Sequence, residues 1–225
     1  MEDPLLHRLP SKEQIQAFPI FQSLPSEQIH VINRLEQCHA IEAELKCCAV
    51  LGFDSESKPT FTKGEVSTGP HLIQLASADQ AFLFQVSHDI LKFLKPILEN
   101  REQIKVGFGL KNDAHLFRKY GIELNNVIEL SKCFKAFGFN NPMGLKNAIA
   151  LLFQVNFPKS KKNSTSNWAR KTLTPHQVEY AAADAYAPVL VFEELLRLGL
   201  LPEHIFNTAL KLKIHPNKIK AETDT

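Results

Sequence analysis

The sequence predicts an α/β fold in which helices flank a mixed five-stranded sheet. Three strand-like segments come first, at residues 49–56, 72–76 and 81–86. The short polar link between the last two is typical of a hairpin, and the three together predict antiparallel strands. Helical and strand patterns then alternate, as they do in parallel crossover units. A long helical pattern over about residues 175–198 follows, with Thr174 as its N-cap and Pro175 in its first turn.

The chain before the first of these strands is less regular. Residues 1–28 hold two short helical candidates interrupted by Pro10, Pro19 and Pro25, which predicts an N-terminal arm rather than a domain. Residues 29–33 alternate well enough for a further short strand, and residues 35–47 predict a helix.

The later elements follow from periodicity and from helix-ending residues. Residues 57–70 form a long loop with two prolines and two glycines. Beyond the hairpin, the patterns place helices at 88–99, 112–120 and 143–153 and strands at 104–108 and 126–130. A polar, basic loop over residues 156–172 leads to the long helix, which Gly199 and Pro202 end. Residues 201–225 are expected to add a short helix and a charged tail.

Composition indicates an ordinary globular protein. The 225 residues are 44% hydrophobic and 22% charged, which is enough apolar content for a sizeable core. The N-terminus shows no signal segment and no stretch reaches the length of a membrane span, so we expect an intracellular, soluble protein with no membrane partner. The four cysteines show no Cys-x-x-Cys spacing, which excludes a zinc site of paired cysteines and argues against a disulfide framework.

The first candidate site residues are Asp54 and Glu56, at the end of the strand over residues 49–56. Side chains alternate along a strand, so these two carboxylates point the same way. They repel each other unless a cation lies between them, and hard divalent ions such as Mg²⁺ accept oxygen ligands of this kind. The alternative is a pair of solvated acids at a fraying strand end.

A second acid, Asp113, follows a strand and a glycine turn over residues 107–110 and opens a helix. Ligands of α/β sheets collect at strand ends of this kind. The turn lacks the third glycine of a dinucleotide loop and the lysine–serine pair of a Walker loop, so a nucleotide-binding loop is rejected. Asp113 can also be explained as an acid at a helix N-terminus, where the helix dipole favours it.

The third candidate segment is the alanine-rich run of the long helix. Tyr180 and Asp184 are four residues apart and share one helix face, and the alanines between them allow close packing against a sheet. An acid on such a buried face is unfavourable unless it lies next to a cation or is fully hydrogen-bonded. This favours a metal ligand over a surface acid.

These motifs, in this order, resemble the tyrosine-bearing (DEDDy) branch of the DEDD superfamily of 3′–5′ exonucleases, which includes ribonuclease D and the Werner exonuclease domain. The resemblance covers about residues 29–199 and includes the runs at 72–75 and 166–168. It implies a ribonuclease H-like fold and an exonuclease domain over residues 29–200. Two positions differ from the family pattern: Ser57 stands where a bulky aromatic often follows the first motif, and Lys171-Thr172 replaces Arg-Pro.

The resemblance also implies the chemistry. Two Mg²⁺ or Mn²⁺ ions would promote hydrolysis of a terminal phosphodiester of DNA or RNA, releasing 5′-mononucleotides. By analogy, Asp54 bridges the ions, Glu56 and Asp184 complete one site, and Asp113 acts on the second. Tyr180 would orient the attacking water. The competing hypothesis is a catalytically silent nucleic-acid-binding protein on the same scaffold, but such proteins usually lose one or more of these acids.

Substrate-binding residues are predicted from charge. Residues 130–178 contain eight basic residues and no acidic one, which is the pattern of a phosphate-facing surface. The candidates for contacts with a single strand or a 3′-recessed end are Lys111, His115, Lys159, Lys161, Lys162, Trp168 and Arg170. Solvated lysines, a surface histidine and a packing role for the tryptophan are the alternatives. The choice between DNA and RNA and the oligomeric state stay open.

Overall fold

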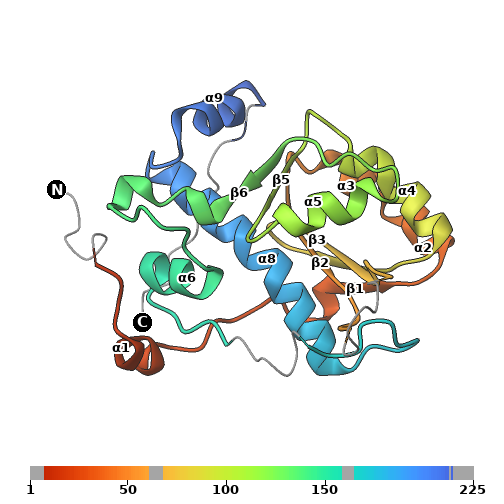
Figure 1. Cartoon of the computed structure of the whole chain (residues 1–225), viewed down its shortest axis with the longest axis horizontal. Helices are drawn as coiled ribbons and strands as arrows, with labels where there is room; N and C mark the ends of the chain where they lie inside the picture. The colour runs from red at the N-terminus through yellow and green to blue at the C-terminus, as the bar shows by residue number, and fades with distance from the viewer. Residues whose placement is uncertain (1–7, 61–67, 159–164, 213, 215–225) are drawn as a thin grey trace.

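The computed structural model describes residues 8–60, 68–158, 165–212 and 214, and its centre is one mixed sheet (Figure 1). Six strands lie in the order β1-β4-β3-β2-β5-β6. Their bounds are β1 Ile29–Ile32, β2 Val50–Glu56, β3 Leu72–Ala76, β4 Ala81–Gln85, β5 Ile104–Gly107 and β6 Val127–Glu129. β3 is antiparallel to both of its neighbours, β2 and β4, whereas β5 and β6 continue from β2 in parallel. The α/β class and the mixed sheet are therefore confirmed.

The predicted number of five strands is wrong, because β1 joins the sheet as a sixth. It runs parallel to β4, with Ile29 opposite Ala81 and Ile32 opposite Phe84. The short strand at residues 29–33 was expected, but its partner lies about fifty residues further along the chain. No local turn signal marks such a pairing, so the sequence could not place this strand at the edge of the sheet.

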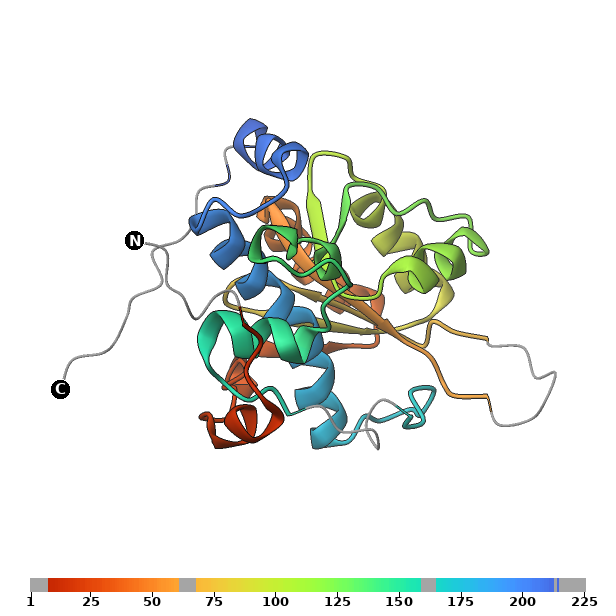
Figure 2. The same ribbon diagram turned by 60° about the vertical axis from the view of Figure 1, so that its left-hand side comes forward.

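Helices cover both faces of the sheet (Figures 1 and 2). The helices are α1 Lys12–Ala17, α2 Leu35–Ala40, α3 Glu42–Cys47, α4 His88–Leu98, α5 Lys111–Arg118, α6 Leu145–Phe153, α8 Pro175–Arg197 and α9 Glu203–Lys211. Short 3₁₀ turns lie at η2 Ser26–Gln28, η3 Leu130–Lys132 and η4 Lys135–Phe137. The helix expected over residues 35–47 is divided at Ile41, whose φ of −109° and ψ of 3° leave the helical region. None of the described helices combines the length and the apolar character needed to cross a membrane.

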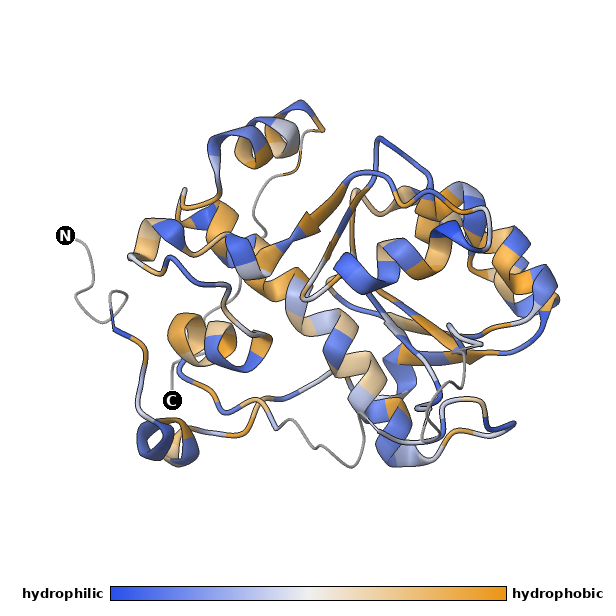
Figure 3. Cartoon of the chain, viewed as in Figure 1, coloured by the Kyte–Doolittle hydropathy of each residue, from blue (hydrophilic) through white to orange (hydrophobic). Residues whose placement is uncertain are grey.

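Side chains along each strand point alternately into two apolar cores. On one face, Phe53, Leu75 and Phe82 pack with side chains of α2, α3, α4 and α5. On the other face, Leu72 and Leu83 pack against α8. Because side chains alternate with a period of two residues, the strands could be predicted from the sequence. Figure 3 shows the apolar residues gathered on the strands and on the inward helix faces.

The helix α8 crosses the sheet and positions the site. Thr174 and Gln177 form a capping box at its start, and Pro175 occupies the first turn, as expected. Its closest approach is to β2: a Cβ atom added at Gly52 would lie 1.8 Å from the carbonyl oxygen of Ala185. A glycine on the strand and alanines on the helix therefore bring the two backbones together.

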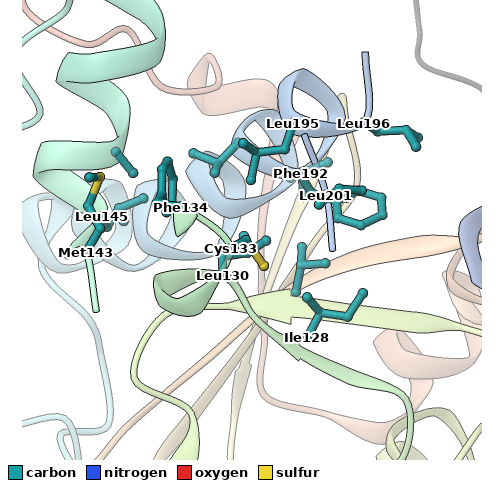
Figure 4. Packing of buried hydrophobic residues seen from close by; sticks show 14 of the residues in the cluster. Ile128, Leu130, Cys133, Phe134, Met143, Leu145, Phe192, Leu195, Leu196 and Leu201 are labelled. Atoms are coloured by element: carbon teal, nitrogen blue, oxygen red, sulfur yellow. The ribbon is translucent and has the colours of Figure 1, made fainter. Parts of the chain in front are cut away.

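The C-terminal half of α8 is anchored by a separate apolar cluster (Figure 4). Phe192 and Leu195 pack with Ile128 of β6, Leu130 of η3 and Leu201 beyond the helix. Burying side chains of this size stabilises the fold by about 1.5–3 kcal/mol each. The position of α8 along the sheet is therefore fixed at the end far from its capping box.

Candidate metal centre

Three carboxylates meet where β2 ends beneath α8. Asp54 and Glu56 come from alternate positions of β2, and Asp184 comes from the middle of α8. Each offers an oxygen atom, and the three atoms lie within 4.8 Å of one another. Asp184 is only 5% exposed. Like charges at this spacing oppose one another's ionisation, and all-oxygen ligands fit a hard divalent cation such as Mg²⁺ or Mn²⁺.

Tyr180 lies one helical turn before Asp184 and borders this carboxylate cluster. Burial raises the pKa of its phenol well above the usual range, and the charge of Asp184 and a hydrogen bond with it act next. Asp54 and Glu56 add to the same shift. The phenol is therefore protonated at neutral pH, so its hydroxyl group donates to the carboxylate and acts as a neutral polar group, not as an ionised base.

Asp113 lies outside the cluster of three. Its carboxylate accepts a hydrogen bond from the hydroxyl of Ser55, the residue between the two acids of β2. Because side chains alternate along the strand, Ser55 points away from the face that carries Asp54 and Glu56. Burial raises the pKa of Asp113, while the Ser55 hydrogen bond opposes that shift. Its role as a fourth ligand stays a prediction.

Glu129 fixes the turn that leads to Asp113, and the sequence assigned it no role. Its carboxylate oxygens accept from the backbone N–H groups of Gly109, at 3.0 Å, and Leu110, at 2.8 Å. Gly109 adopts a φ of 78°, which a glycine tolerates without strain. This acid at the end of β6 thus holds the start of α5. An acid at the end of a predicted strand was the only sequence signal for this role.

Gln74 is a second residue that the motifs left without a role. It lies directly opposite Asp54 in the antiparallel β2–β3 pair and is fully buried. Neither polar atom of its amide has a hydrogen-bond partner among the described residues. A buried amide without a partner is unfavourable, and here it lies on the cluster face of the sheet. A polar residue within an otherwise apolar strand was the available signal.

A hollow of about 380 Å³ opens beside the cluster. It is lined by Asp54 and Asp184 and by the apolar side chains of Phe108, Met143 and Leu145, among others. These two carboxylates therefore border a space that also offers apolar contacts, although the sequence singled out none of the three apolar residues.

The predicted substrate-binding residues fall into three groups. Lys111 and His115 are exposed on α5, and Arg170 is exposed near the end of the basic loop. Trp168 is 1% exposed and packs on Tyr180 with ring centroids 6.0 Å apart, which favours the packing alternative over base stacking. The loop lysines lie outside the described residues: Lys159, Lys161 and Lys162.

Known proteins share this sequence pattern. A family profile described as "3′–5′ exonuclease" matches residues 29–199. The Mus musculus bifunctional 3′–5′ exonuclease/ATP-dependent helicase WRN is 30% identical over 189 residues, which cover 77% of this chain and 13% of that protein. The Drosophila melanogaster exonuclease 3′–5′ domain-containing protein 2 is 30% identical over 193 residues, covering 81% of this chain and 32% of that protein. The chain spans less than a third of the length of these relatives.

Solved structures share the fold. The Aedes aegypti Nibbler EXO domain has a TM-score of 0.68 at 21% identity, covering 88% of this chain and 97% of that one. Escherichia coli RNase D has a TM-score of 0.64 at 21% identity, covering 82% and 50%. A Trypanosoma brucei RNase D complex with RNA U12 has a TM-score of 0.63 at 18% identity, covering 86% and 72%. The expected ribonuclease H-like fold is thus confirmed, and with the profile match over residues 29–199 the chain belongs to the 3′–5′ exonuclease family.

Proposed function

We propose that this protein hydrolyses nucleic acids from the 3′ end as a tyrosine-bearing DEDD exonuclease, releasing 5′-mononucleotides. The observation that carries the proposal is the cluster of Asp54, Glu56 and Asp184, whose oxygens lie within 4.8 Å of one another, with Tyr180 hydrogen-bonded to one of them. Membership of the family and the presence of all four motif acids support it.

The three clustered acids would hold one divalent ion, and Asp54 with Asp113 would contribute to a second. Bound Mg²⁺ or Mn²⁺ lowers the pKa of a water molecule and stabilises charge on the reacting oxygens. The net negative charge of the carboxylates matches the charge of the ions. The oxygen-only donor set and the absence of a soft ligand favour these hard cations over zinc.

The chain's own residues orient the reaction. The protonated Tyr180 hydroxyl places a hydrogen-bond donor and acceptor beside Asp184, where it can align a water with the phosphorus atom. The water oxygen forms the new bond to phosphorus as the bond to the 3′-oxygen breaks. The products are a nucleoside 5′-monophosphate and a strand shortened by one residue, and the displaced 3′-oxygen takes up a proton.

The hollow beside the cluster supports attack at a chain end. Its lining combines the apolar Phe108, Met143 and Leu145 with Asp54 and Asp184, so a terminal nucleoside can lie there with its phosphate at the carboxylates. The RNA-bound Trypanosoma brucei RNase D shows that a protein of this fold binds a polynucleotide. The substrate class proposed for this chain is DNA or RNA with an accessible 3′ end.

The test uses end-labelled DNA and RNA oligonucleotides of matched sequence, each with a 3′-hydroxyl or a 3′-phosphate. We expect 5′-mononucleotides from the first time points with Mg²⁺ or Mn²⁺, little turnover with Ca²⁺, and none after chelation. A 3′-phosphate should block or slow the reaction. Binding without hydrolysis under all these conditions would instead support the silent scaffold, and cleavage of a circular single strand would contradict exonuclease action.

A further inference from the structure

A second hollow, here called the basic groove, shares no lining residue with the hollow beside the cluster. It measures about 490 Å³ and is lined by Arg34, His71, Gln85, Trp168, Arg170 and Lys171, among others. The residues around it include three cations and no acid. Arg34, Arg170 and Lys171 are exposed, and none of them pairs with an acid within the described ranges.

The groove is built by segments that are far apart in the sequence. Arg34 precedes α2, whereas Arg170 and Lys171 precede α8. The side-chain amide of Gln85, at the end of β4, donates to the carbonyl oxygen of Arg170 at 3.0 Å and fixes that segment to the sheet. Trp168 forms a buried floor. The three cations therefore line the same basic groove and are not distributed over separate parts of the surface.

Two contacts link lining residues of the groove to Glu56 and Tyr180 of the site. The backbone N–H of His71 donates to the carbonyl oxygen of Glu56 at 2.9 Å. Trp168 packs against Tyr180. The Glu56 and Tyr180 side of the cluster thus adjoins the basic groove, while Asp54 and Asp184 adjoin the apolar hollow. The cluster therefore has two separate neighbours, the apolar hollow and the basic groove.

His71 acts as a wall residue rather than as a further cation. Its Nδ1 accepts from the backbone N–H of Lys58 at 3.1 Å, and its Nε2 lies 3.3 Å from the Thr68 hydroxyl. Burial, followed by the charge of Lys58, lowers its pKa. The positive charge of the groove therefore comes from its two arginines and its lysine.

We infer that the basic groove binds the backbone phosphates of the single strand on the 5′ side of the scissile bond, while the apolar hollow takes the 3′-terminal nucleoside. The inference rests on the proposed function, because it assumes hydrolysis at the carboxylates and adds the direction in which the strand crosses them. Contacts to phosphates are independent of base identity, so the groove should accept DNA and RNA alike. It should act on binding and leave the chemical step unchanged.

The variant for the test combines Arg34→Glu, Arg170→Glu and Lys171→Glu. Its matched control combines Lys12→Glu, Lys92→Glu and Lys211→Glu, three exposed lysines on α1, α4 and α9 that change the net charge equally. The first measurement is fluorescence anisotropy of a labelled single strand of about fifteen nucleotides across a salt series with Ca²⁺, where binding is read without hydrolysis. Thermal melting checks that both variants are folded.

We expect the groove variant to weaken strand binding by about tenfold or more, in line with the loss of three exposed charge contacts. Its slope of log affinity against log salt should fall by about 2, because each phosphate contact on a single strand accounts for roughly 0.7. The control variant should keep the wild-type slope. Equal salt slopes in the groove and control variants would overturn the inference. A loss of binding that appears with a 3′-recessed duplex but not with a single strand would also overturn it.

The second measurement separates the groove from catalysis. A dinucleotide has only the scissile phosphate, so its hydrolysis should be the same in the groove variant and the wild type, while KM for the longer strand rises and kcat does not change. Equal losses on the dinucleotide and the long strand would overturn the inference. If the wild type binds strands through the groove but hydrolyses neither substrate, the proposed function fails and the groove stands as a binding site.

Discussion

On one face of β2, the carboxylates of Asp54 and Glu56 lie close to that of Asp184. They can do so because Gly52 and the alanines of α8 let the two backbones pack closely. On the other face, Ser55 holds Asp113 through a single hydrogen bond. The first arrangement depends on how closely two backbones pack, and packed backbones are stiff. The second depends on one hydroxyl group on a strand and the start of a short helix. We therefore expect the cluster of three to tolerate little displacement, whereas the position of Asp113 can be adjusted by its surroundings.

The largest effect should come from removing a charge from the cluster face. Asp54→Asn or Asp184→Asn should abolish hydrolysis, exceeding the roughly 10²–10⁴-fold typical of one positioned acid–base group. Each change also removes repulsion between carboxylates, so without metal the melting temperature should rise, and Mg²⁺ should no longer raise it. Calorimetric melting with and without Mg²⁺ measures this. Glu36→Gln, on the exposed surface of α2, is the control and should leave both properties unchanged.

The two faces can be compared directly at adjacent residues. Gly52→Ala places a methyl group against the Ala185 carbonyl and should displace α8, reducing stability by about 1–3 kcal/mol. A shift of about 1 Å in the carboxylates should reduce kcat by roughly 10²-fold. Phe53→Leu, which points into the opposite core, should lower stability with little change in kcat. Denaturant unfolding and single-turnover rates separate the two, and equal kcat losses would show that the acid spacing does not depend on α8 packing.

Tyr180→Phe keeps the ring of the cluster face and removes only the hydroxyl group. We expect kcat to fall by about 10²-fold, within the range for positioned groups, while the Mg²⁺ concentration for half-maximal activity changes little. Tyr186→Phe, six residues further along α8, provides a control for the loss of a phenol. Near-normal turnover in Tyr180→Phe would remove this residue from the mechanism.

A smaller effect is expected on the opposite face. Ser55→Ala removes the hydrogen bond to Asp113 and should reduce activity by roughly 10- to 100-fold, as is typical when an outer partner of a ligand is lost. Extra Mn²⁺ should recover part of the loss, and Ser55→Thr should restore it because the hydroxyl is kept. A metal titration of activity measures both. If Ser55→Ala behaves like the wild type while Asp113→Asn is inactive, the hydrogen bond does not position Asp113.

Patterns along the chain predicted the parts of the molecule that local periodicity controls. The spacing of Asp54 and Glu56 on a strand and of Tyr180 and Asp184 on a helix gave two faces that the fold brings together, because both periods are fixed by backbone geometry. The antiparallel hairpin of β3 and β4 followed from its short connection, and the start of α8 from its capping residues.

Features made by long-range packing could not be predicted in the same way. The parallel β1–β4 pair has no local turn, and the placement of Asp113 depends on Glu129 accepting from the turn before α5. The basic groove needs Arg34 beside residues 168–171, which are distant in the sequence. The acid-free run contains Arg170 and Lys171, but not the arginine that comes from outside it.

The dependence of the cluster on α8 also has a consequence for the order in which the protein is made. All six strands precede residue 130, yet Asp184 lies far beyond them on a helix that begins at Pro175. A nascent chain that has released the whole sheet from the ribosome still lacks the third carboxylate. Under the proposed function, a nascent chain therefore gains activity only after α8 has docked on the sheet.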